Sequence, residues 1–139
     1  MSQALTPALA LDYVRELSAD VRAAIVLDGA GRLLAGPPEL ADLGRELLAA
    51  AGDAAELEAG TGAGVVCAVR STEHAAVAVC GRFAIPAVVR QDLRAAVAAL
   101  AGRRPGSAAP AAALEAPPGD PLARAAEALI SAVQRGSEV

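Results

Sequence analysis

Apolar residues recur with the period of amphipathic helices in three segments of this chain. These segments are residues 7–20, 38–51 and 86–102. In the first, Leu9, Tyr13 and Leu17 repeat every four residues, which predicts that they form the buried face of a helix. Thr6 and Pro7 are suited to begin that helix as its N-cap and its first residue.

Short apolar runs between these helices predict five strands. We expect them at residues 23–27, 33–35, 56–58, 65–70 and 75–81. Glycines at 28–31 and 60–64 supply the positive φ that tight hairpin turns require. The resulting order is helix, two strands, helix, three strands, helix. It favours an α/β (α+β) fold in which helices sandwich a five-stranded antiparallel sheet.

The C-terminal part of the chain has a different pattern. Residues 103–119 are rich in proline, alanine and glycine and indicate a linker, which separates a domain at 1–102 from a tail helix at 120–135. An apolar stripe runs along this tail helix through Leu122, Ala126, Leu129, Ile130 and Val133. A lone helix of about 15 residues is marginally stable. The tail helix must therefore dock back onto the domain or bind a partner, and the pattern leaves both open.

Composition and charge narrow the class of protein. The 139 residues suffice for one domain and a tail, and 55% are hydrophobic, too many for a disordered chain. The net charge of −4 disfavours nucleic-acid binding. Since no apolar run reaches about 18 residues, no membrane insertion is expected. The start of the chain lacks the basic and apolar regions of a signal peptide, so we expect a cytoplasmic protein.

Candidate chemistry is sparse. His74 is the only histidine and falls in a predicted turn, so we assign no catalytic residue and expect no enzyme. Cys67 and Cys80 are expected to be buried free thiols, directly opposite one another in one strand register and on opposite faces in another. Two cysteines and one histidine are too few for a structural zinc site. The chain has no lysine to complete a phosphate loop, so we expect neither metal nor cofactor.

Charged pairs at two places have plain structural interpretations. Glu56 and Glu58 share one face of a short strand, where they can discourage incorrect edge pairing. Arg90 and Arg94 lie four residues apart on the third helix. They are expected on a solvated face, with contact to an acidic partner as the alternative.

Two segments carry a family resemblance. AAIVLDGAGRLLAG at 23–36 resembles the opening hairpin of the Roadblock/dynein-light-chain family, and VVRQDLRAAVAAL at 88–100 resembles its closing helix. The chain departs from the family at Ile85-Pro86, where a glycine is common. The resemblance implies a non-enzymatic adaptor that pairs with itself or a paralogue, in bacteria often as the partner or regulator of a Ras-like small GTPase.

The resemblance also implies where the protein binds. Pairing would use the second helix and third strand, at Leu40, Leu43, Gly44, Leu47, Ala51, Glu56, Leu57 and Glu58. Apart from the resemblance, the charge and apolar patterns themselves give the possible partner contacts Arg90, Arg94, Leu122, Leu129, Ile130 and Val133. Besides a small GTPase, a sensor kinase is a possible partner. The alternative function is a small-molecule-sensing domain of a bacterial signalling system, which would need a roomy pocket with several convergent polar groups.

Overall fold

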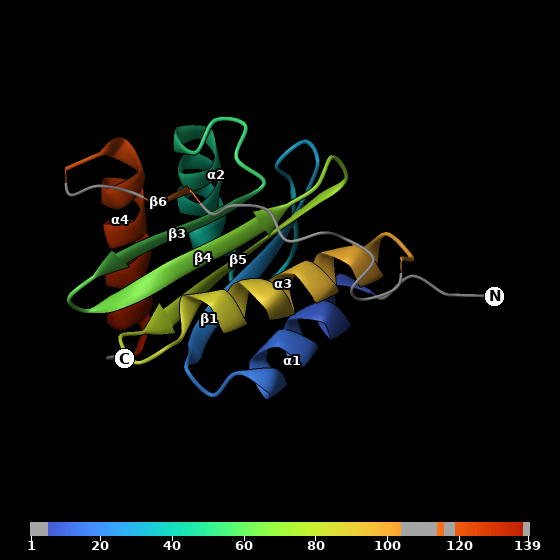
Figure 1. Cartoon of the computed structure of the whole chain (residues 1–139), viewed down its shortest axis with the longest axis horizontal. Coiled ribbons are helices and arrows are strands. Elements are labelled where there is room, and N and C mark those ends of the chain that lie inside the picture. Colours follow the sequence, from blue (N-terminus) through green and yellow to red (C-terminus); the bar gives the residue numbers. More distant parts are fainter. Residues whose placement is uncertain (1–5, 104–113, 116–118, 138–139) are drawn as a thin grey trace.

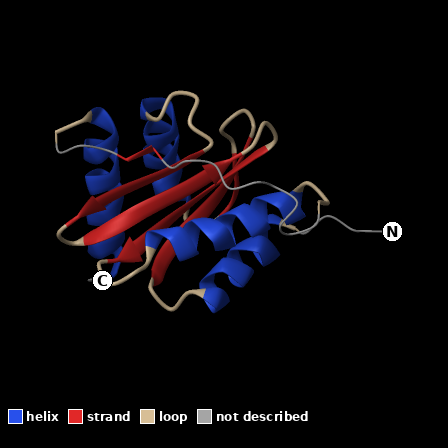
Figure 2. Ribbon diagram, viewed as in Figure 1, coloured by secondary structure: helices blue, strands red, loops and turns tan. Residues whose placement is uncertain are grey.

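A six-stranded sheet forms the middle layer of the molecule in the computed structural model, which describes residues 6–103, 114–115 and 119–137 (Figures 1 and 2). The strands are β1 (Val21–Asp28), β2 (Leu33–Ala35), β3 (Glu56–Thr61), β4 (Gly64–Arg70), β5 (His74–Gly81) and β6 (Leu114–Glu115). Their order across the sheet is β2-β1-β5-β4-β3-β6. Pairing is antiparallel except between β3 and β6. The α/β class and the antiparallel body are confirmed, and β6 raises the expected five strands to six.

Helices cover both faces of this sheet. On one face lie α1 (Pro7–Leu17) and α3 (Pro86–Leu100), and on the other lie α2 (Ala41–Ala50) and α4 (Pro121–Ser137) (Figure 1). A short 3₁₀ turn, Pro38–Leu40, leads into α2. The α1 helix ends three residues earlier than predicted because Ser18 adopts an extended conformation and the chain enters β1 at Val21.

Each face of the sheet has its own apolar core. Toward α2 and α4 point residues such as Ile25, Leu57 and Val66, and toward α1 and α3 point Val26, Val65 and Cys67. Alanine is frequent in both cores, so the helices lie close to the strands. At Gly44 an added Cβ would lie 2.5 Å from Cδ1 of Ile25, which explains the glycine inside α2.

The strand register places the two cysteines differently from either expected arrangement. Cys67 lies opposite Ala78, and Cys80 lies opposite Val65, so the two cysteines share one face but are not directly paired. Both are buried free thiols. Alternation along each strand was visible in the sequence, but the register between strands depends on the whole hairpin.

Among the residues that the structure describes, no helix is long and apolar enough to cross a membrane.

Candidate protein-interaction surfaces

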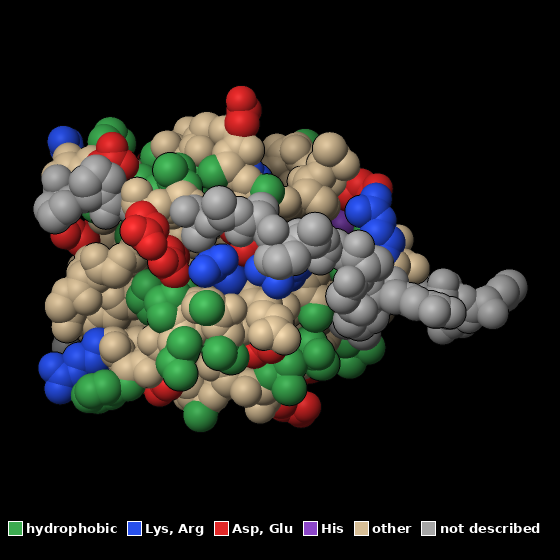
Figure 3. Space-filling view, in the orientation of Figure 1, with side chains coloured by type: hydrophobic (Ala, Val, Ile, Leu, Met, Phe, Trp, Pro, Cys, Tyr) green, Lys and Arg blue, Asp and Glu red, His purple; other side chains and the backbone are tan. Residues whose placement is uncertain are grey.

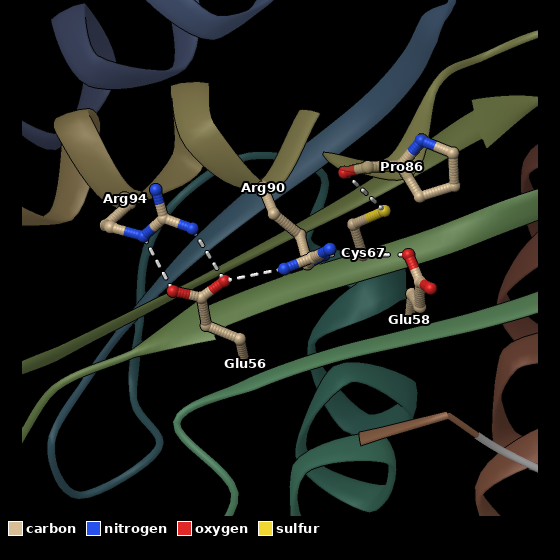
Figure 4. Close-up of polar contacts among 6 residues, drawn as sticks. All are labelled: Glu56, Glu58, Cys67, Pro86, Arg90 and Arg94. Carbon is tan, nitrogen blue, oxygen red and sulfur yellow. Dashed lines mark hydrogen bonds and ion pairs between the residues drawn. The ribbon is translucent and has the colours of Figure 1, made fainter. Parts of the chain in front are cut away.

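Among the described residues, Glu56 is a charged residue buried in the sheet. It lies at the start of β3, is 2% exposed, and faces α3 (Figure 4). Arg90 Nη1 donates to Oε1 of Glu56 at 3.0 Å, while Arg94 donates from Nε to Oε2 at 2.7 Å and from Nη2 to Oε1 at 2.9 Å. Three charge-assisted hydrogen bonds from two arginines thus compensate one buried carboxylate.

Glu58 completes this cluster on the same strand face. Its Oε2 lies 3.5 Å from Nε of Arg90, which makes an ion pair (Figure 4). The hydrogen bonds to Glu56 raise the pKa of Arg94, so the arginine stays charged. Two glutamates and two arginines therefore join β3 to α3. The solvated helix face expected for Arg90 and Arg94 is wrong, because both guanidinium groups turn inward to Glu56.

The helix residues predicted for pairing lie largely in the protomer's own core. Leu40, Gly44, Leu47 and Ala51 are buried, and Leu43 is half-buried against the same core. On β3, Leu57 is buried on this face, whereas Glu56 and Glu58 point to the other. We name the surface formed by α2, β3 and these residues predicted for pairing the α2–β3 surface.

The tail helix α4 packs beside α2 on the α2–β3 surface (Figure 1). All four of the tail residues predicted to contact a partner are buried there: Leu122, Leu129, Ile130 and Val133. Of the two possibilities that the sequence left open for this helix, the structure shows docking onto the domain.

Strand β6 extends the tail along the sheet. It pairs in parallel with β3, at Leu57 with Leu114 and at Glu58 with Glu115. The proline- and alanine-rich pattern gave no sign of this strand. Most of the predicted linker lies outside the described residues.

Arg70 is a structural residue that the sequence analysis missed. At the end of β4, its guanidinium donates to the carbonyl oxygens of Leu48, Gly52 and Ala54. These carbonyls belong to the end of α2 and the connection that follows it, where helical backbone acceptors lack intrahelical partners. Its signal was a lone arginine closing an otherwise apolar strand.

Large apolar side chains remain exposed on the opposite helical layer. Figure 3 shows hydrophobic side chains gathered over α1 and α3. The exposed set comprises Leu9, Tyr13, Leu17, Phe83, Ile85 and Val88, which we name the α1–α3 apolar surface. Phe83 is the most exposed, at 76%, and the guanidinium of Arg82 lies 4.8 Å from its ring centre. The predicted burial of Leu9, Tyr13 and Leu17 is wrong, because α1 turns the smaller Ala10 and Val14 inward.

A hollow of about 310 Å³ lies between the β1–β2 turn, the β4–β5 turn and α2. His74 lines it, and the buried Nδ1 of this residue has no hydrogen-bond partner in the described structure. The other polar groups are engaged: Asp28 accepts from the N–H groups of Ala30 and Arg32, and Arg70 donates to backbone carbonyls. Among the described residues, no three His, Cys, Asp or Glu side chains are grouped to hold a metal ion.

Burial disfavours chemistry at the cysteines. It raises the pKa of the Cys67 thiol far above its ordinary value and, together with nearby Asp20, raises the pKa of Cys80 to about 12. Both thiols therefore stay protonated at neutral pH, whereas a cysteine nucleophile acts as the thiolate.

Comparison with solved structures finds the same architecture elsewhere. A Roadblock/LC7 domain from Streptomyces avermitilis is 14% identical, with a TM-score of 0.57 over 71% of this chain and 96% of that chain. MglB in a tetrameric arrangement is 18% identical, with a TM-score of 0.51 over 87% of this chain and 88% of that chain. No family model and no curated protein matches the sequence. The chain has the Roadblock/LC7 fold.

Proposed function

We propose that this chain is a non-enzymatic adaptor that acts by binding other proteins. It pairs with a second copy of itself or a paralogue through the α2–β3 surface, and it binds a Ras-like small GTPase through the α1–α3 apolar surface. The fold supports an adaptor, and the small GTPase follows from the family resemblance of residues 23–36 and 88–100. The observation that carries the proposal is the set of exposed apolar side chains on one helical layer.

The α1–α3 apolar surface has the character of a protein-binding site. Soluble monomers seldom leave large apolar patches exposed unless the patch contacts something. Aromatic side chains are frequent binding hot spots, and Phe83 is exposed. Arg82 stacks on that ring and restricts its motion, which lowers the entropy lost on binding.

Self-association is supported by the sheet edge and by a protein of the same fold. Beyond its two pairs with β6, strand β3 continues through Ala59, Gly60 and Thr61, which have no outer strand among the described residues. Unpaired strand edges are natural sites for adding another strand. MglB forms a tetrameric arrangement.

A GTPase would be regulated through its conformation. Its switch segments order and disorder with the bound nucleotide. An adaptor that binds one switch conformation more tightly shifts the population toward that conformation. This mechanism needs surface complementarity and requires no catalytic group on the adaptor.

The GTPase contact is tested by titration with a Ras-like small GTPase from the same organism, loaded with GDP or with a non-hydrolysable GTP analogue. We expect Phe83→Ser with Ile85→Ser to weaken binding by at least about tenfold. The matched control is Leu34→Ser, which alters an exposed leucine on β2. Equal affinity for all three chains would overturn the surface assignment, and no binding by any of them would overturn the GTPase partner.

Self-association is tested by light-scattering mass across a range of protein concentrations. A mass that rises toward two chains supports pairing. A one-chain mass at every concentration contradicts a homodimer.

The hollow beside His74 favours small-molecule sensing as the second candidate function. Its volume and the unpartnered Nδ1 are the supporting observations. A thermal-shift screen with nucleotides and metabolites tests it, because a ligand that binds the folded chain raises its Tm. The sensing function predicts a shift that His74→Ala abolishes, and a screen without any shift contradicts it.

A further inference from the structure

The tail, defined here as β6 and α4, occupies part of the surface that the proposed function assigns to self-pairing. Leu122, Ala126 and Leu129 of α4 are at most 1% exposed. They lie in the same core as Leu47 of α2 and Leu57 of β3. The tail therefore covers this surface from within the same chain.

The tail also covers the sheet edge next to this core. Strand β6 takes the outer backbone positions beside Leu57 and Glu58, which belong to the predicted pairing strand. A second copy that added its own strand at these positions would have to displace β6, because each backbone group can pair with one neighbour on that side. One segment thus blocks both the helical and the strand part of the α2–β3 surface.

Docking of α4 changes the character of this face. The outward side chains of α4 are polar, among them Arg124, Glu127, Gln134 and Arg135. Without α4, apolar groups of α2, β3 and β4 such as Leu47, Leu57 and Val66 would lose their cover. A patch of this kind needs another occupant in water. A second copy that has released its own tail presents the same patch, which suits the self-complementary interface of a twofold dimer.

The attachment of the tail favours reversible release. None of Arg124, Glu127 and Arg135 makes an ion pair with the described part of the body. Arg124 donates to the carbonyl oxygen of Gly119, two residues before α4. The N-terminal turn of α4 is capped locally, since the N–H of Leu122 donates to the carboxylate of Asp120. The cap at its N-terminus therefore comes from its own segment, and α4 contacts the body through apolar packing.

We propose that the tail is an intramolecular competitor for the self-pairing surface. The docked tail keeps the chain closed and opposes pairing, and release of α4 and β6 opens the surface to a second copy. This inference rests on the self-pairing of the proposed function. A tethered segment has an effective concentration of about the millimolar range, so the docked tail weakens pairing until something releases it. The apparent affinity for a second copy then scales with the fraction of open chains.

The test uses the full chain with one aspartate placed on either side of α4. Leu129→Asp puts a carboxylate into the buried contact, and Gln134→Asp puts the same group on the exposed side of the same helix. Hydrogen exchange reports release of α4, and sedimentation over a range of concentrations reports the dimer Kd. We expect Leu129→Asp to speed exchange in α4 and to tighten the dimer by at least about tenfold, with Gln134→Asp unchanged.

The outcomes separate this inference from the proposed function. If α4 is released and a dimer forms with unchanged Kd, the competition is overturned and self-pairing stands. If α4 is released and the chain stays monomeric at every concentration, self-pairing through this surface is overturned. If the backbone amides of β1 and β5 exchange as slowly in the variant as in the unmodified chain, the body remains folded. If Leu129→Asp unfolds it, Leu129→Ala is measured in the same way and decides between the same outcomes.

Discussion

Each face of the sheet has an apolar core, but the two pairs of helices that cover the faces differ in which side chains they expose. On one face, α2 and α4 bury their large apolar residues and present polar ones to water. On the other, α1 and α3 leave Leu9, Tyr13, Leu17 and Val88 exposed, and Phe83 and Ile85 add to them from the loop before α3. The α1–α3 layer thus leaves large apolar side chains open to solvent, whereas the α2–β3 surface is covered by the chain's own tail.

The same comparison extends to how each layer holds β3. The α3 side uses the buried carboxylate of Glu56 and the half-buried guanidinium groups of Arg90 and Arg94, while the α2 side uses apolar packing around Leu57. Charge pairs fix one geometry, because a buried charge without its partner is costly. Apolar packing tolerates exchange of one occupant for another of similar shape. The apolar contacts of α4 are therefore exchanged more easily than the charged contacts of α3.

The largest expected effect comes from removing the central charge. Glu56→Ala leaves the half-buried guanidinium groups of Arg90 and Arg94 beside no carboxylate except that of Glu58, and should lower the free energy of unfolding by about 3–5 kcal/mol. Denaturant unfolding measures it. Glu46→Ala, an exposed glutamate on α2, is the control and should change stability by less than about 0.5 kcal/mol. Equal stability of both variants would show that the charges do not hold β3 to α3.

The next largest effect is expected from the same leucine-to-alanine substitution, made on each of the two faces. Leu47→Ala empties a fully buried site on α2 and should cost about 2–5 kcal/mol. Leu17→Ala alters a leucine that is 51% exposed on α1 and should cost less than about 0.5 kcal/mol. Denaturant midpoints at an unchanged m-value give both numbers. A large loss at Leu17 would remove it from the α1–α3 apolar surface and place it in the core.

The effect that is smallest at neutral pH concerns the thiols beneath the α1–α3 layer. Folding raises the pKa of Cys67 and Cys80 above the ordinary value of 9.0. Their contribution to stability is therefore complete below about pH 9 and is lost as the pH rises from there toward the raised values. Between about pH 8 and about pH 11, the chain should lose stability more steeply than the Cys67→Ala, Cys80→Ala variant. Parallel pH profiles, or rapid alkylation of the folded chain at neutral pH, would contradict burial of these thiols.

Much of the fold could be predicted from the local pattern of the sequence. The spacing of apolar residues and the glycine turns predicted the order of elements, and the strand at 33–35 has the predicted bounds. The local pattern does not predict where a strand ends when its length depends on the strand beside it. Residues 59–61 extend β3 beyond its predicted end because β4 offers pairing partners as far as Gly64.

The interaction surfaces were harder to predict from the sequence, for a related reason. A four-residue repeat shows that a helix has an apolar stripe, but Leu9 and Val14 are both apolar and only one can face a close-packed sheet. Likewise, an arginine four residues from another is typical of a solvated face. Arg90 and Arg94 turn inward because Glu56, more than thirty residues earlier in the chain, lies beneath them.

The sequence by itself determined the helices, the five strands of the antiparallel body and the need of the tail helix for a covered stripe, because these properties follow from neighbours a few residues apart. Only the tertiary structure decided what covers that stripe and which apolar side chains stay exposed. Those outcomes depend on the shapes and charges of segments far apart in the chain, such as α4 against Leu57 and α3 against Glu56. An amphipathic pattern specifies that a face must be buried, and packing selects its partner.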